Sequence, residues 1–85
     1  GGVNMRNITA NGYKRITKQA AERLYKAGQP VLFCPVNLRP GGMWGNGCII
    51  AKKEGRTFEQ DVNEFEFYNC SSETGNYTAF YVKEV

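Results

Sequence analysis

Hydrophobic and polar positions change period along the chain, and the first periodic segment has the pattern of a helix. Across residues 18–27, apolar side chains share one face and charged or polar side chains occupy the other. Thr17 can cap this segment, because its hydroxyl can accept a hydrogen bond from an orphan backbone N–H of the first turn. Gly28 and Pro30 then favour a stop. The pattern therefore predicts a helix over residues 18–27.

Two short apolar runs follow, Val31–Cys34 and Cys48–Ala51, and both are too short for a helix. They have the composition of buried strands. The segment between them, Asn37–Gly47, contains four glycines and Pro40. A strand, a glycine-rich connection and a second strand predict a wide hairpin.

The C-terminal part predicts a second hairpin. Residues 64–67 alternate strictly between Glu and Phe, which would place Phe65 and Phe67 on one face of a strand. A polar turn over residues 71–75 and a run of β-forming residues over 77–82 follow. The whole pattern predicts an α+β fold, with one helix packed on an antiparallel sheet of about four strands that is built from two hairpins.

The length sets the domain organisation. A chain of 85 residues has room for one core, and its 11 aromatic residues suffice to fill it. We therefore expect a single α+β domain over residues 5–85. Residues 1–4 precede the first methionine, and we expect them to be either additions to the natural chain or a disordered end.

The charge is divided unevenly. Residues 1–53 contain nine Lys or Arg and one acid, a net charge of +8, whereas residues 54–85 have a net charge of −5. Two interpretations stay open. The halves can complement each other across the fold, or the basic half can form a surface that binds phosphates.

Eight basic residues are the candidate nucleic-acid contacts, and they lie on or before the helix and around the first hairpin. They are Lys14, Arg15, Lys18, Arg23, Lys26, Arg39, Lys52 and Lys53. The alternative is that the helix charges are only solvated. Base stacking on the sheet is disfavoured in this interpretation, because Glu64 and Glu66 would face away from the predicted Phe65 side and repel a phosphate backbone.

The glycine-rich loop carries a candidate partner contact. Met43 and Trp44 lie between its glycines, and the sequence matches neither a phosphate-binding loop nor a dinucleotide fingerprint. A large apolar side chain on such a loop can anchor a partner. Alternatively, Trp44 folds back and caps the core.

The residue types argue against a catalytic function. Histidine is absent, and Cys34, Cys48 and Cys70 have no metal-binding spacing, so we expect three reduced thiols. The carboxylates of residues 59, 61, 64 and 66 could bind a cation, but alternating acids are also typical of a solvated strand face. We expect no catalytic residue, no metal and no cofactor.

Several segments resemble a family of short proteins carried by conjugative elements and phages of Gram-positive gut bacteria. The resemblance rests on residues 13–18, 20–25, 62–65 and 67–70, with the pairs Cys34-Pro35, Arg39-Pro40 and Met43-Trp44. It implies a bacterial cytoplasm and an accessory role. No apolar run of roughly 18 residues is present, so we expect no membrane span.

Together these observations predict a small non-enzymatic binding module. It would contact nucleic acid or protein through a basic helix face and the Trp44 loop. The alternative is a protein-binding or self-association module with no nucleic-acid role.

Overall fold

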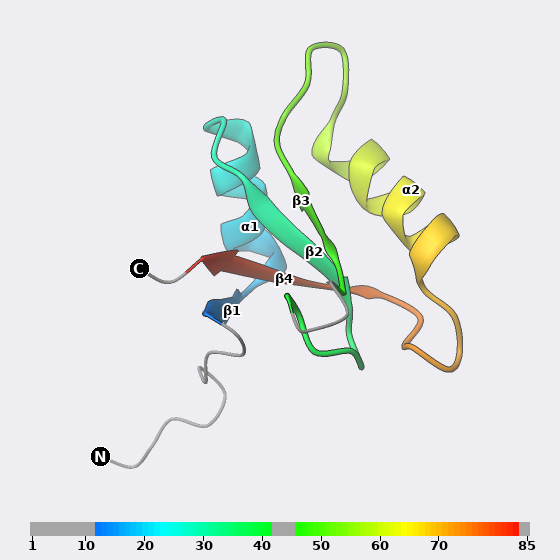
Figure 1. Ribbon diagram of the computed structural model, residues 1–85. Coiled ribbons are helices and arrows are strands. Elements are labelled where there is room, and N and C mark those ends of the chain that lie inside the picture. Colours follow the sequence, from blue (N-terminus) through cyan, green and yellow to red (C-terminus); the bar gives the residue numbers. More distant parts are fainter. Residues whose placement is uncertain (1–11, 42–45, 84–85) are drawn as a thin grey trace.

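The protein, seen here in a computed structural model, is described over residues 12–41 and 46–83. In chain order the elements are β1 (Tyr13–Ile16), α1 (Lys18–Lys26), β2 (Val31–Pro35), β3 (Cys48–Ile50), α2 (Phe58–Asn69) and β4 (Thr78–Lys83) (Figure 1). The strands form one antiparallel sheet in the order β1-β4-β2-β3. The predicted α+β class with a four-stranded antiparallel sheet is therefore confirmed.

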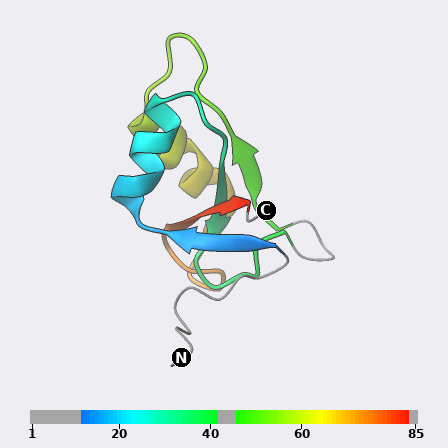
Figure 2. The ribbon, with the colours of Figure 1, turned by 90° about the vertical axis from the view of Figure 1, so that its left-hand side faces the viewer.

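The strand order interleaves two units. Both β1 and β2 pair antiparallel with β4, so they run in the same direction on either side of it. By the same reasoning β3 and β4 run in the same direction on either side of β2. Each helix thus joins two strands that have one strand of the other unit between them, which is a split β-α-β connection. Both helices lie on the same face of the sheet (Figure 2).

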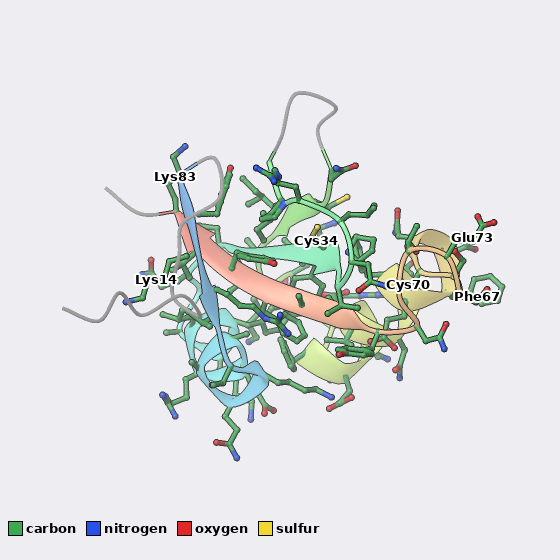
Figure 3. All side chains as sticks on the ribbon, turned by 90° about the horizontal axis from the view of Figure 1, so that it is seen from below. Lys14, Cys34, Phe67, Cys70, Glu73 and Lys83 are labelled. Atoms are coloured by element: carbon green, nitrogen blue, oxygen red, sulfur yellow. The ribbon has the colours of Figure 1, made fainter. Side chains whose placement is uncertain are left out.

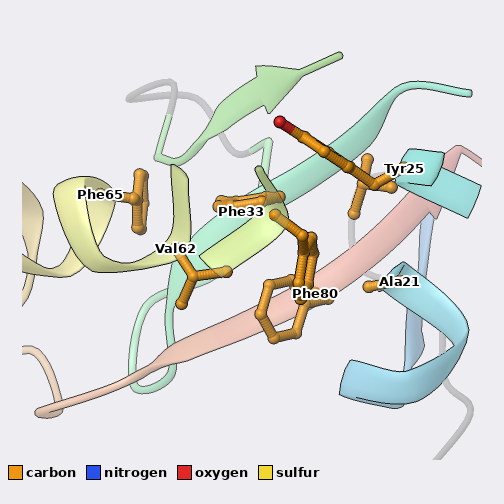
Figure 4. Packing of buried hydrophobic residues seen from close by; sticks show 8 residues of the cluster. Ala21, Tyr25, Phe33, Val62, Phe65 and Phe80 are labelled. Carbon is orange, nitrogen blue, oxygen red and sulfur yellow. The ribbon is translucent and has the colours of Figure 1, made fainter. Parts of the chain in front are cut away.

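The core between the helices and the sheet is largely aromatic (Figure 4). The ring of Phe33 on β2 meets the rings of Phe58, Phe65 and Phe80 edge to face, at centroid distances of 5.1–6.0 Å. Such pairs add to the free energy of burial, which amounts to roughly 1.5–3 kcal/mol for each large apolar side chain. This cluster fixes both helices against the two central strands.

The described start of the connection after β2, residues 36–41, packs on the other face of the sheet. Leu38 packs against a second cluster that contains Leu32 and Tyr81. The connection then reaches the edge strand, where a Cβ at Gly41 would collide with the ring of Tyr13. Gly41 has a φ of 57°, so both the close approach and the backbone conformation require glycine there. Figure 3 shows this connection on the opposite side of the sheet from the helices.

Helix α1 confirms the prediction in detail. Thr17 Oγ1 accepts a hydrogen bond from the backbone N–H of Ala20 at 3.0 Å, and Gly28 follows the helix with a φ of 84°. The strand β2 is buried along its whole length, also as predicted. The strand β3 pairs with β2 but is exposed at Cys48 and Ile49, because it lies at the edge of the sheet.

The predicted strand over residues 64–67 is wrong, because this segment belongs to α2. Thr57 and Gln60 form a reciprocal capping box, in which each side chain bonds the other's backbone N–H. From that start, Phe58, Val62 and Phe65 fall on one buried helix face. Phe67 is 79% exposed rather than on the same face as Phe65. Residues 12–41 and 46–83 therefore form two helices and one hairpin, and β4 pairs with β1 and β2 instead of with residues 64–67.

Candidate nucleic-acid interface

The structure divides the eight predicted basic residues among different parts of the surface. All eight are exposed. Lys14 and Arg15 lie on the edge strand β1, and three more lie on α1. Lys52 and Lys53 follow β3, at the opposite edge of the sheet. Arg39 lies in the connection that covers the second face. The predicted residues therefore do not form one patch, and β1 with α1 holds the largest group.

A residue outside the prediction extends the group on β1. The register places Lys83 of β4 opposite Tyr13, and Tyr81 opposite Arg15. Lys83 and Arg15 therefore lie on the same face of the sheet. Lys83 Nζ lies 4.9 Å from the centre of the Tyr13 ring, within range of a cation–π interaction. Lys14 alternates with Tyr13 and Arg15 along β1, so its side chain lies on the opposite face of the sheet. We call Lys14, Arg15 and Lys83, which border this edge of the sheet on its two faces, the basic edge.

The basic edge forms no ion pair with any acidic residue that the structure describes, within residues 12–41 and 46–83. Figure 3 shows Lys14 and Lys83 at one end of the molecule, with Phe67 and Glu73 at the other. Helix α2 carries four acidic residues and no basic one. The uneven charge of the sequence is thus also uneven in space.

The basic residues of α1 are partly paired. Lys26 lies 3.3 Å from Glu22 one turn earlier, and Lys18 Nζ lies 3.7 Å from Glu59 Oε2 on α2. In the described part of the chain, the Lys18–Glu59 contact is the one ion pair that joins residues 1–53 to residues 54–85. Among the described residues, the two halves are therefore joined by a single ion pair, and that pair is exposed. Such exposed pairs contribute roughly 0–1 kcal/mol.

An open groove of about 670 Å³ lies where the chain passes from β1 into α1. One wall is formed by Arg15, Ile16, Thr17 and Lys18, the other by Val62 and Glu66 of α2, and the floor and end by residues 77–80. The carboxylate of Glu66 accepts a hydrogen bond from the backbone N–H of Thr78 at 3.0 Å, which ties α2 to the start of β4. Lys18 and Glu59 link the two walls.

Thr78 adds an unsatisfied group to this floor. Its hydroxyl is buried and has no hydrogen-bond partner among the described residues. Thr78 lies close to the Cys70 thiol: burial raises the pKa of Cys70, and Thr78 lowers it to a smaller extent. A buried hydroxyl without a partner is uncommon in a folded protein.

The predicted carboxylate cluster is held by protein groups. Asp61 Oδ2 accepts a hydrogen bond from the Tyr25 hydroxyl at 2.5 Å, and Asp61 Oδ1 accepts one from Arg56 Nε at 2.8 Å. Arg56 also contacts Glu64. Burial, with the neighbouring Asp61, raises the pKa of Tyr25 to about 12. Three of the four carboxylates therefore already have a cationic partner, because Glu59 pairs with Lys18 while Asp61 and Glu64 pair with Arg56. In the part of the chain that the structure describes, no group of three or more acidic or cysteine residues could hold a metal ion.

The three cysteines are free thiols. Burial raises the pKa of Cys34 to about 11, and its Sγ lies 3.6 Å from the carbonyl oxygen of Leu38. A thiol with such a pKa is not a nucleophile at neutral pH. Cys48 is exposed on the edge strand β3.

Met43 and Trp44 lie outside the described residues. The described base of their loop is closed by two hydrogen bonds, from Gly41 N to Asn46 O and from Asn46 Nδ2 to Arg39 O, both 3.0 Å. A different exposed aromatic pair lies at the C-terminal end of α2, where the rings of Phe67 and Tyr68 meet at 4.9 Å. The sequence prediction missed this pair because it placed Phe67 in a strand.

Comparisons with models of protein families, with curated proteins and with solved structures found no match for this chain. No described helix has both the length and the apolar character needed to cross a bilayer. A function can therefore be argued only from the charges, exposed side chains and groove described above.

Proposed function

We propose that the protein is a small non-enzymatic binding module that contacts nucleic acid through the basic edge and the adjoining basic residues of α1. The observation that carries this proposal is that Lys14, Arg15 and Lys83 project from one end of the sheet with no ion pair to a described acidic residue. Its association with a mobile genetic element and its cytoplasmic location stay predictions from the resemblance.

Unpaired cations suit a phosphate backbone. Each phosphate that a Lys or Arg neutralises releases condensed counterions, so the affinity falls as salt rises. The basic edge offers three such cations, and Lys18 and Arg23 follow it along the chain, on α1. Both Lys18 and Arg23 are exposed, and the weak Lys18–Glu59 pair does not prevent Lys18 from exchanging its partner.

The correction of α2 weakens an objection to this function. The acids of residues 64 and 66 would both have faced a bound backbone if they lay on a strand of the sheet. Both belong instead to α2, where Glu64 contacts Arg56 rather than the sheet, and only Glu66 reaches the sheet, at the backbone of Thr78. The basic edge lies on β1 and β4, whereas four of the eight acidic residues of the chain lie on α2.

The test is a salt titration of binding to DNA or RNA, with a control variant at the other edge of the sheet. Replacing Lys14, Arg15 and Lys83 together with Gln should weaken binding at low salt by at least tenfold, and should reduce the slope of log affinity against log salt by ~2. Replacing Lys52 and Lys53 with Gln, at the other edge of the sheet, should have a much smaller effect. Binding that is independent of salt, or equal losses in both variants, would contradict the proposal.

A second function, protein binding or self-association without nucleic acid, is favoured by the exposed aromatic pair. Phe67 and Tyr68 are 79% and 74% exposed and lie next to each other on α2. Aromatic side chains are enriched at the centres of protein interfaces. If this function holds, Phe67→Ser should abolish a concentration-dependent dimer or a captured complex without lowering the melting temperature. A strictly monomeric protein that captures no partner would argue against it.

A further inference from the structure

We propose that the groove between β1–α1 and α2 receives an unpaired base of a single-stranded nucleic acid. This inference rests on the proposed nucleic-acid binding and names the substrate class of the same surface. The groove adjoins the basic edge through Arg15, which belongs to both. A strand whose phosphates lie along the basic edge therefore passes the mouth of the groove.

The size and surface of the groove suit an aromatic ring. Its volume of about 670 Å³ lies within the roughly 300–1,000 Å³ of small-molecule pockets. Ile16, Val62 and Phe80 give it apolar sides, and Tyr77 lines it while remaining 56% exposed. Base stacking on an exposed aromatic side chain is a general mode of single-strand recognition, and it tolerates any base because every base has a π face.

The charges along the groove are arranged for a nucleotide rather than for a phosphate alone. Arg15 and Lys18 line the wall that continues the basic edge, so the phosphates belong on that side. Glu66 lines the opposite wall, and its charge disfavours a phosphate there. A carboxylate accepts hydrogen bonds from an exocyclic amino group, such as N4 of cytosine. Glu66 therefore favours bases with an amino group over thymine or uracil.

A duplex cannot use the groove in this way. Bases in a duplex are stacked and paired, and extracting one costs the free energy of unstacking and unpairing it. The basic edge alone would bind a duplex and a single strand through their phosphates in a similar way. The inference therefore predicts a preference for single strands that the basic edge by itself does not explain.

The first experiment measures the fluorescence anisotropy of labelled single-stranded oligo(dC) and of a hairpin duplex with the same number of phosphates. We expect the single strand to bind about tenfold more tightly. Tyr77→Ala should remove most of this preference, because the stacking surface is lost. Tyr68→Ala is the matched control, since Tyr68 is an exposed tyrosine on α2 that does not line the groove. It should leave both affinities unchanged.

The second experiment tests the base preference with Glu66→Gln. The glutamine oxygen can still accept the hydrogen bond from Thr78 N, so the local structure is retained. Its amide N–H groups can donate to a base where the carboxylate could only accept. We expect the native protein to bind oligo(dC) at least threefold more tightly than oligo(dT), and Glu66→Gln to reduce or reverse that ratio.

The outcomes separate the inference from the proposed function. Equal affinity for duplex and single strand, or equal effects of Tyr77→Ala and Tyr68→Ala, would overturn the inference while salt-dependent binding through the basic edge stands. Absence of binding to any oligonucleotide at low salt would overturn both. A single-strand preference that Tyr77→Ala abolishes and Tyr68→Ala leaves intact would support the inference.

Discussion

Two polar links join α1 to α2, and they differ in almost every physical respect. The first is buried: the Tyr25 hydroxyl donates to Asp61, whose other oxygen is held by Arg56. The second is exposed: Lys18 and Glu59 meet at 3.7 Å, with more than half of each side chain accessible to solvent. The buried link lies near the end of α1, and the exposed link lies at its start, beside the groove.

The buried link should stabilise the fold, whereas the exposed pair can exchange its partner. Removing one partner of a buried charged hydrogen bond leaves the other without compensation, so the buried link should stabilise the contact between the helices. The exposed pair is solvated in either state, so Lys18 can leave Glu59 for a phosphate at little cost. The helices can thus stay fixed while one wall of the groove changes its ionic partner.

Breaking the buried link should have the largest effect. Asp61→Ala removes the acceptor of the Tyr25 hydroxyl and one of the two carboxylates that hold Arg56. We expect the free energy of unfolding to fall by about 3 kcal/mol, measured by urea denaturation. Asp61→Asn is the control, because it keeps the shape and one acceptor, and it should lose less. A loss below about 0.5 kcal/mol for Asp61→Ala would show that the link does not stabilise the fold.

Removing only the hydroxyl should have a smaller effect. Tyr25→Phe keeps the ring, which packs edge to face on Phe58 at 5.4 Å, and leaves Asp61 paired with Arg56. We expect a loss of about 1.5 kcal/mol at neutral pH, the value of one hydrogen bond to a charged group. Denaturation of Tyr68→Phe, which changes an exposed tyrosine, should give no measurable loss and serves as the comparison.

The Tyr25 hydroxyl should also make the free energy of unfolding depend on pH between about 10 and 12. Burial and Asp61 raise the pKa of Tyr25 from 10.0 to about 12, so the folded protein holds this proton more tightly than the unfolded chain. The resulting stabilisation is complete below pH 10 and is lost as the pH rises towards 12. The advantage of the native protein over Tyr25→Phe should therefore shrink across this window. A constant difference in unfolding free energy from pH 9 to pH 12 would contradict the shift.

The two helices also show why the fold was only partly predictable. Helix α1 has a capping threonine, one apolar face and a glycine stop, which all indicate the same element. In α2 the Glu-Phe alternation of residues 64–67 has the two-residue period of a strand, but only over four residues. The capping box of Thr57 and Gln60 was present in the sequence and predicts a helix start, but it lies seven residues before the alternation. The segment forms a helix rather than a strand because a 12-residue helix buries Phe58, Val62 and Phe65 together.

The candidate site was predictable in composition but not in arrangement. The sequence shows which residues are basic, and it identified Lys14, Arg15 and Lys18. It could not place Lys83 beside β1, since that contact depends on the pairing of the two ends of the chain. Nor could it show the groove, because Glu66 had been assigned to a strand and only its position on α2 brings it opposite Lys18.

The exposed link should give the smallest change in stability together with a change in binding. Glu59→Gln removes the partner of Lys18, and we expect the free energy of unfolding to change by less than about 0.5 kcal/mol, because the pair is solvated. The released Lys18 faces a groove with one negative charge fewer nearby, so affinity for an oligonucleotide should rise about threefold at low salt and the gain should vanish at high salt. Glu73→Gln changes the net charge equally at the far end of the molecule (Figure 3) and should produce a smaller gain. Equal gains would show that only net charge matters, and a loss of more than about 1 kcal/mol in Glu59→Gln would mean that the Lys18–Glu59 pair stabilises the fold as the buried link does.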